Sequence, residues 1–126
     1  MTIRFESVAP QFTVSDVVRT AEHYRDTLGF EIAGYWGTPP VFAIVSRGDV
    51  EIFFNGATGG LPRTGRAPGA YDAYVQVAGV DALAAELRGR GADVLEGPED
   101  RVYGRRELVV RDCNGLVIAF GEAKEK

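Results

Sequence analysis

The chain has 126 residues, which suffices for one compact domain with its own core and is too short for two ordinary domains. It is 45% hydrophobic and 25% charged, as soluble globular proteins are. The formal net charge of -4 disfavours nucleic acid as a partner, because phosphate binding depends on lysine and arginine. The same charge tolerates a cationic small molecule, although solubility alone also explains it.

The sequence also indicates a cellular location. The single cysteine, Cys113, cannot form a disulfide within the chain, and no Cys/His set has the spacing of a zinc site. The first residues lack the apolar region of a signal peptide, and no stretch approaches the roughly 18 apolar residues that span a bilayer. We therefore expect a soluble, cytoplasmic protein with no membrane partner.

The first half of the chain has the pattern of a strand, a helix and three further strands. Apolar residues recur at helical spacing from Val17 to Leu28, and Gly29 suits the left-handed turn that ends a helix. A helix is therefore predicted over residues 14–29. Runs of strand-like composition predict strands over residues 8–14, 30–36, 41–46 and 50–55.

The second half repeats this order of elements. A helix is predicted over residues 80–88, and strands over residues 71–77, 93–95, 106–111 and 116–120. When the halves are aligned with an offset of 63 residues, Val14 falls on Val77 and Val17 falls on Val80. The repeated order predicts an α+β protein of two βαβββ modules.

A segment rich in glycine and proline separates the two halves. Residues 55–70 contain five glycines and two prolines and little that could pack, which predicts a loop. We expect a single domain over residues 1–126, with modules at about 5–56 and 70–122 and a linker at about 57–69. Because one small sheet with one helix buries little, the modules must pack on each other or on a partner chain.

Local motifs accompany this order of elements. They are residues 10–16 (PQFTVSD) with His23-Tyr24 and residues 28–30 (LGF), residues 48–54 (GDVEIFF), residues 77–83 (VAGVDAL), and residues 103–107 (YGRRE) with residues 112–120 (DCNGLVIAF). Together they resemble the vicinal-oxygen-chelate superfamily, which contains glyoxalases, bleomycin-resistance proteins and dioxygenases. The resemblance extends over nearly the whole chain and implies a cup-shaped mixed sheet around a ligand cavity.

The resemblance also implies that the family's metal site is degraded. Metal-dependent members place one ligand on each of four strands, and these positions correspond to Ala9, Glu51, Asp72 and Ala119. Alanine cannot coordinate a metal, and the single histidine, His23, lies on the predicted first helix, where the family has no ligand. Two carboxylates without an imidazole would bind Zn²⁺, Ni²⁺ or Fe²⁺ weakly. We therefore expect no metal and no other cofactor.

Among family members, the chain is most similar to those of the bleomycin-resistance type, which are associated with antibiotic resistance. This implies metal-independent sequestration of a small aromatic or cationic molecule in a cleft between the two chains of a homodimer. The candidate ligand-binding residues are aromatic or charged: Tyr35, Trp36, Phe42, Glu51, Phe54, Asp72, Tyr103 and Arg105. The aromatic rings would stack on planar ligands, and the carboxylates would favour cations. If Arg105 instead bound an acidic group, the ligand would be anionic.

Two other functions remain open from the sequence. The chain could be a lyase, isomerase or hydrolase in which Glu51 acts as a general base, with or without a weakly held divalent metal. It could also be a structural or regulatory subunit that uses the fold only for interaction. The bland interpretations are that Phe42 and Phe54 are core residues and that Glu107 pairs with a neighbouring arginine. Cys113 is expected to be exposed and non-catalytic, because nothing near it completes a nucleophilic triad.

Overall fold

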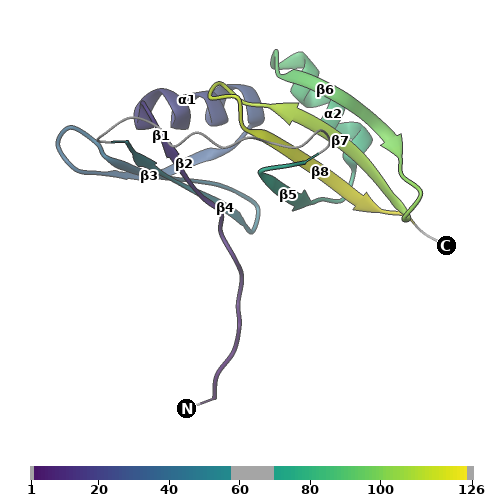
Figure 1. Ribbon diagram of the computed structural model, residues 1–126, viewed down its shortest axis with the longest axis horizontal. Coiled ribbons are helices and arrows are strands. Elements are labelled where there is room, and N and C mark those ends of the chain that lie inside the picture. Colours follow the sequence, from purple (N-terminus) through teal and green to yellow (C-terminus); the bar gives the residue numbers. More distant parts are fainter. Residues whose placement is uncertain (1, 58–69, 125–126) are drawn as a thin grey trace.

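The computed structural model describes residues 2–57 and 70–124 and contains two βαβββ modules (Figure 1). The elements of the first module are β1 (Gln11–Val14), α1 (Val17–Leu28), β2 (Glu31–Trp36), β3 (Phe42–Arg47) and β4 (Val50–Gly56). Those of the second are β5 (Ala73–Gln76), α2 (Val80–Gly89), β6 (Asp93–Asp100), β7 (Arg105–Arg111) and β8 (Val117–Ala123). The predicted α+β class and the repeated order of elements are confirmed.

Each module forms a mixed sheet of four strands with the same topology. The order is β1-β4-β3-β2 in the first sheet and β5-β8-β7-β6 in the second. In each, the strand before the helix runs parallel to the last strand of the module, while the other neighbours are antiparallel. The two helices begin at Val17 and Val80, 63 residues apart, as the predicted repeat requires.

Local sequence signals set the ends of α1. The Asp16 side chain caps the helix by accepting a 2.9 Å hydrogen bond from the Arg19 backbone N–H, which otherwise has no partner within the helix. Gly29 ends the helix with φ 75°, a left-handed conformation that glycine adopts without a Cβ penalty. The buried face of α1 contains the apolar stripe predicted from the sequence, including Tyr24 and Leu28.

Each sheet has one face covered by its helix and one open face. Helix α1 packs against β2, β3 and β4, and α2 packs against β6, β7 and β8. Side chains alternate between the two faces of a strand, so Ile52 and Phe54 of β4 lie under α1 with no exposed surface. In the second sheet, Leu108 and Val110 of β7 are buried in the same way. A hydrophobic cluster extends across both modules on the covered side.

The modules contact each other through their helices. The Tyr24 hydroxyl of α1 donates a buried 2.8 Å hydrogen bond to Oδ2 of Asp112, in the turn between β7 and β8. The Arg47 guanidinium at the end of β3 pairs with the Glu86 carboxylate of α2 at 2.7 Å. These contacts join the covered sides of the two sheets.

Several strand boundaries differ from the sequence prediction. Strand β1 begins at Gln11, three residues later than predicted from residue 8, and residues 2–8 project away from the body (Figure 1). Strand β6 continues to Asp100, well beyond the predicted residues 93–95, because the sheet accommodates Gly97-Pro98 through register shifts. The linker predicted at 57–69 lies outside the described residues except for residue 57. Within the described chain, no helix is a candidate membrane span.

Candidate functional site

The open face of the first sheet contains three aromatic side chains from adjacent strands. Trp36 of β2, Phe42 of β3 and Phe53 of β4 form a line that we call the aromatic row. The ring centroids of Trp36 and Phe42 are 5.9 Å apart, and those of Phe42 and Phe53 are 5.8 Å apart, in edge-to-face geometry. Trp36 is 50% exposed, so the row presents a large aromatic surface to solvent.

Glycine holds the tryptophan flat on this face. Gly34 lies two residues before Trp36 on the same face of β2, and a Cβ built at Gly34 would be 2.8 Å from the Trp36 ring. Any larger residue would therefore lift the ring from the sheet. Glu51, on the same face of β4, is exposed and lies opposite Ser46 in the β3–β4 ladder.

The open face of the second sheet is built around a buried carboxylate. Glu107 of β7 has no exposed surface. Its Oε2 accepts hydrogen bonds of 2.8 Å from the hydroxyls of both Tyr74 and Tyr103, and its Oε1 accepts one of 3.0 Å from Arg101 Nε. We call these four residues the Glu107 cluster. Tyr74 reaches Glu107 by lying across Gly121 of β8, where a Cβ would overlap the Tyr74 hydroxyl.

The electrostatics of the Glu107 cluster follow from these bonds. Burial on its own would raise the pKa of Glu107, but the hydrogen bonds from Tyr103, Arg101 and Tyr74 outweigh it and lower that pKa. Burial, together with the bond to Glu107, raises the pKa of Tyr74 to about 12. At neutral pH, Glu107 is therefore a fixed anion and Tyr74 a neutral donor.

An arginine lies over this cluster. The Arg105 guanidinium carbon is 5.9 Å from the centroid of the Tyr74 ring, within the range of a cation–π contact. Tyr71 flanks the same ring, at 6.4 Å between centroids. Three of the five tyrosines of the chain thus gather on the open face of the second sheet.

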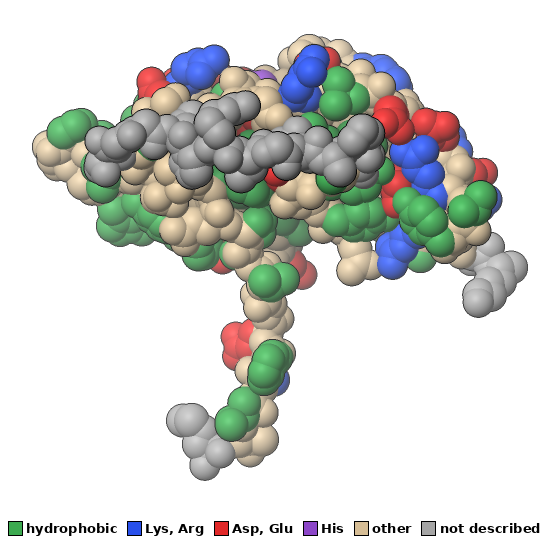
Figure 2. Space-filling view, viewed as in Figure 1, with side chains coloured by type: hydrophobic (Ala, Val, Ile, Leu, Met, Phe, Trp, Pro, Cys, Tyr) green, Lys and Arg blue, Asp and Glu red, His purple; other side chains and the backbone are tan. Residues whose placement is uncertain are grey.

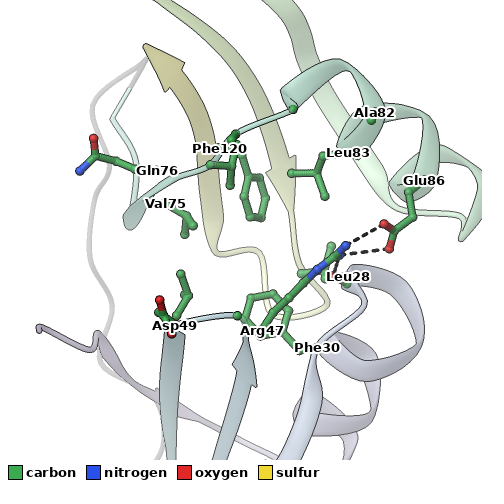
Figure 3. Close-up of a pocket in the computed structure, with 15 residues that line it drawn as sticks. Leu28, Phe30, Arg47, Asp49, Val75, Gln76, Ala82, Leu83, Glu86 and Phe120 are labelled. Atoms are coloured by element: carbon green, nitrogen blue, oxygen red, sulfur yellow. Dashed lines mark hydrogen bonds and ion pairs between the residues drawn. The ribbon is translucent and has the colours of Figure 1, made fainter.

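A cleft of about 590 Å³ lies at the seam between the modules, on the covered side of the sheets (Figure 3). Its lining is mainly apolar and includes Phe30, Val75, Leu83 and Phe120. Figure 3 shows the Arg47 guanidinium reaching across the edge of the cleft to Glu86. None of the ligand-binding residues predicted from the sequence lines this cleft.

The structure separates the predicted site residues into four sets, two of which lie on open faces. Trp36, Phe42 and Glu51 share the open face of the first sheet, and Tyr103 and Arg105 lie at the open face of the second.

Tyr35 and Phe54 are different, because their side chains face α1. Phe54 is fully buried against Tyr24, at 5.0 Å between ring centroids, and Tyr35 packs against the core. Their predicted place on the ligand face is therefore wrong. The physical reason is the two-residue period of a strand, which puts Phe54 and Glu51 on opposite faces of β4. The aromatic side chain beside Glu51 on the open face is that of Phe53.

Asp72 has a structural partner. Its Oδ2 accepts a 2.8 Å hydrogen bond from the Val117 backbone N–H, and its own N–H donates to the Val117 carbonyl at 2.8 Å. Asp72 thereby joins the beginning of β5 to the beginning of β8.

The donor set at the family's metal positions does not fit a transition metal. Ala9 and Ala119 have no donor atoms, Asp72 is bonded to the backbone, and Glu51 is exposed. The described residues include no group of three or more His, Cys, Asp or Glu side chains that could hold a metal ion. The side chains at these four positions therefore do not form a transition-metal site.

The single histidine, His23, and the single cysteine, Cys113, lie close to the turn that contains Asp112. His23 packs edge-on against Tyr24, its Nε2 is buried without a hydrogen-bond partner, and burial lowers its pKa. Cys113 is half-buried, so the prediction that it is exposed is wrong. Burial raises the pKa of the Cys113 thiol, which disfavours the reactive thiolate.

The comparisons with known proteins agree with this fold. Residues 4–120 match the model of the Glyoxalase/Bleomycin resistance protein/Dioxygenase superfamily, and the chain therefore belongs to that superfamily. No match is found among curated proteins.

Solved structures of the same fold cover almost the whole chain. TioX from Micromonospora sp. ML1 is 17% identical with a TM-score of 0.76, over 94% of this chain and 99% of that one. A putative glyoxalase family protein from Bacillus anthracis is 19% identical with a TM-score of 0.71, over 98% and 100% of the two chains. A glyoxalase/bleomycin resistance protein/dioxygenase from Nocardioides is 20% identical with a TM-score of 0.68, over 98% and 87%. At these identities the likeness shows the fold alone.

Sequence reasoning missed three parts of the open faces. Phe53 could have been found, because it has the same strand parity as Glu51. Tyr74 could have been found from the alternation of β5, which puts it on the face opposite the buried Val75. Nothing in the sequence indicates that Tyr74, Tyr103 and Arg101 meet at Glu107, because their partnership depends on the pairing of β5, β8 and β7.

Proposed function

We propose that this protein binds a small planar aromatic molecule on the open faces of its sheets, without a metal and without chemical change. The observation that carries this proposal is the aromatic row, in which a half-exposed Trp36 is seated on Gly34 beside Phe42 and Phe53. Soluble proteins rarely leave a tryptophan and two phenylalanines adjacent on an uncovered sheet face unless that face contacts a ligand or partner.

The chemistry of the aromatic row favours a flat ligand. Each aromatic contact contributes about 0.5–1.5 kcal/mol beyond the burial of area, so a planar ring spanning three side chains gains several such contacts. The row is held in place by its own edge-to-face packing, so little order must be gained on binding. Glu51, on the same face, would add an attraction for a cationic group.

A second copy of the chain is the proposed cover for these faces. Polar and apolar residues alternate from Thr2 to Glu6, as they do in a half-buried strand. The apolar side chains of this segment are nevertheless exposed: Ile3 by 85%, Phe5 by 97% and Val8 by 91%. Exposing large apolar side chains to water is unfavourable, and packing them on a partner chain would remove this unfavourable exposure. A homodimer would turn two open faces into one closed cleft.

Catalysis by Glu51 has less support. A lone carboxylate works as a general base when burial holds its proton affinity near neutral pH, and Glu51 is exposed. Binding is therefore the better explanation of the same face.

The test is a titration that follows the fluorescence of Trp36, the one tryptophan of the chain. Quinoline, N-methylquinolinium and bleomycin serve as probes, and at least one should give saturable quenching. Phe53→Leu should weaken that binding about tenfold, the loss of one or two aromatic contacts. Tyr35→Leu is the matched control, because it removes an aromatic ring from the other face of the same sheet, and its Kd should stay within about twofold.

Two results would contradict the proposal. A flat response of the wild-type protein to all three probes would remove the aromatic row as a binding site. Elemental analysis of protein purified without chelator that found about one transition metal per chain would contradict metal-independent binding.

A further inference from the structure

We propose that the open face of the second sheet selects an aromatic ligand that carries an anionic group, with the ring on Tyr74 and Tyr103 and the anion on Arg105. This inference rests on the proposed function, because it assigns the charge of the ligand that the open faces bind. Of the two alternatives that the sequence left open, it favours the anionic ligand bound by Arg105 over the cationic one.

The first step is that the two tyrosine rings form a rigid platform. Both hydroxyls donate to the same oxygen of Glu107, and Tyr74 also lies on Gly121 without space below it. Tyr74 and Tyr103 are nevertheless 39% and 62% exposed. A platform that is already fixed loses little conformational entropy when a ligand stacks on it.

The second step is that Glu107 cannot serve a cationic ligand. The carboxylate has no exposed surface, and its two oxygens already accept three hydrogen bonds. Arg101 pairs with it at 3.0 Å, and the same guanidinium also pairs with the half-exposed Glu96 at 2.8 Å and Glu99 at 3.4 Å. The buried Glu107 is therefore a structural anchor, and the carboxylates beside it already share Arg101.

The third step is that Arg105 has no carboxylate partner within residues 2–57 and 70–124. The neighbouring Arg106, on the other face of β7, pairs with Asp81 at 3.0 Å and with Asp100 at 3.1 Å. Arg105 makes no ion pair with any of the described residues and rests on the Tyr74 ring. A guanidinium in this position keeps its planar set of donors for a ligand carboxylate, sulfonate or phosphate, each of which it can bind through two parallel bonds.

These steps assign a ligand class. A ring stacked on the tyrosine platform places an acidic substituent within reach of the arginine that flanks the platform, so both contacts form with one small molecule. An aromatic cation would gain the stacking and meet an unpaired arginine, which repels it.

The test compares three naphthalene probes that differ only in charge: 2-naphthoate, 2-naphthalenemethanol and 2-naphthylmethylammonium. Their Kd values are measured by isothermal titration calorimetry on the full chain at low salt. We expect 2-naphthoate to bind about five- to tenfold more tightly than the alcohol, as a charge-assisted hydrogen bond on a half-exposed site implies, and the ammonium probe to bind most weakly.

Two adjacent arginines provide matched variants. Arg105→Gln should reduce the affinity for 2-naphthoate to that for the alcohol and leave the alcohol unchanged. Arg106→Gln removes the same charge from the opposite face and should retain the preference for 2-naphthoate within about twofold. Thermal unfolding of both variants verifies that each is folded.

The outcomes separate this inference from the proposed function. If the ammonium probe binds as tightly as 2-naphthoate, or if the two variants lose the preference equally, the anion assignment is wrong while ligand binding by the open faces stands. If no probe binds at all to the wild-type protein, both the assignment and the proposed function fail.

Discussion

Glu107 shows how a buried carboxylate is tolerated when both of its oxygens accept hydrogen bonds. A charge without exposed surface would cost several kcal/mol if it were unpaired. Here two tyrosine hydroxyls and one guanidinium supply the lost hydration, and the net effect is a lowered pKa. The same bonds orient the two rings on the open face, so the residue that stabilises the sheet also shapes the candidate site.

A substitution at this residue tests the arrangement. Glu107→Gln keeps the shape, but it points an amide at three donors, so we expect a loss of about 2–3 kcal/mol in the free energy of unfolding, measured in urea. Glu96→Gln is the control, because it removes the partly exposed partner of Arg101 and should cost less than about 1 kcal/mol. Equal losses in the two variants would show that the Glu107 bonds contribute no more than a surface ion pair.

The pH dependence of the same residue has a definite sign. Because the pKa of Glu107 is lower in the fold than its ordinary value of 4.5, the unfolded chain binds the proton more readily. The contribution of Glu107 to stability is therefore present above about pH 4.5 and is lost as the pH falls below it. In Glu107→Gln, the unfolding free energy should fall less steeply over that acidic range than in the wild type.

The open faces also show which parts of the candidate site could be predicted from the local residue pattern and which could not. The sequence VEIFFN over residues 50–55 predicts β4 with Val50, Ile52 and Phe54 on one face, and the structure confirms this face as core. Glu51 and Phe54 are three residues apart, so the two-residue period of a strand puts them on opposite faces. By contrast, the meeting of Tyr74 with Glu107 depends on strands far apart in sequence, which no local pattern contains.

At the scale of elements, α1 and the β7–β8 turn form the main buried link between the modules. Asp112 holds its own turn by accepting hydrogen bonds from the Asn114 and Leu116 backbones through Oδ1, and its Oδ2 accepts from Tyr24. The Arg47–Glu86 pair is the second link, but its side chains are 37% and 34% exposed. The buried bond should therefore contribute more to the packing of the modules than the ion pair does.

Two substitutions compare these links. Tyr24→Phe removes one hydroxyl and leaves the Asp112 oxygen buried without its donor, so we expect a loss of about 1–2 kcal/mol in the free energy of unfolding. Glu86→Gln removes a half-exposed charge and should cost less than about 1 kcal/mol. Chemical denaturation of both variants measures the difference. A larger loss in Glu86→Gln would show that the ion pair is the principal link.

The order of elements was predictable because helix and strand differ in period. The stripe from Val17 to Leu28 fits 3.6 residues per turn, and the strands around it alternate. Strand β6 was predicted too short because Glu96 to Asp100 combines acidic residues with Gly97-Pro98, a composition typical of loops. Its pairing with β7, which the sequence does not display, keeps it in the sheet.

At the scale of the whole molecule, the two modules share a core on their covered sides, and both helices of the described residues pack on those sides, away from the open faces. Strand β1 continues backward into a projecting segment, residues 2–8, whose residues are all exposed. Figure 2 shows hydrophobic side chains along this projecting segment, where Ile3, Phe5 and Val8 are almost fully exposed. The exposed apolar segment and the exposed aromatic side chains each need a surface to pack against, and a second copy of the chain would supply both surfaces.

The oligomeric state tests this explanation through the projecting segment. Sedimentation equilibrium should give twice the mass of the chain at micromolar concentration. Replacing Ile3, Phe5 and Val8 together with serine should shift the protein to monomer, because burying each of these side chains is worth about 1.5–3 kcal/mol. The matched control replaces the Arg4–Glu6 pair of the same segment with two glutamines and should leave the dimer intact, since that pair is exposed.

Two outcomes would contradict this explanation. A wild-type chain that stays monomeric at every concentration would rule out the shared cleft, and a dimer that survives the serine substitutions would assign the contact to another surface. If the cleft requires two chains, the serine variant should lose the quenching of Trp36 together with the dimer.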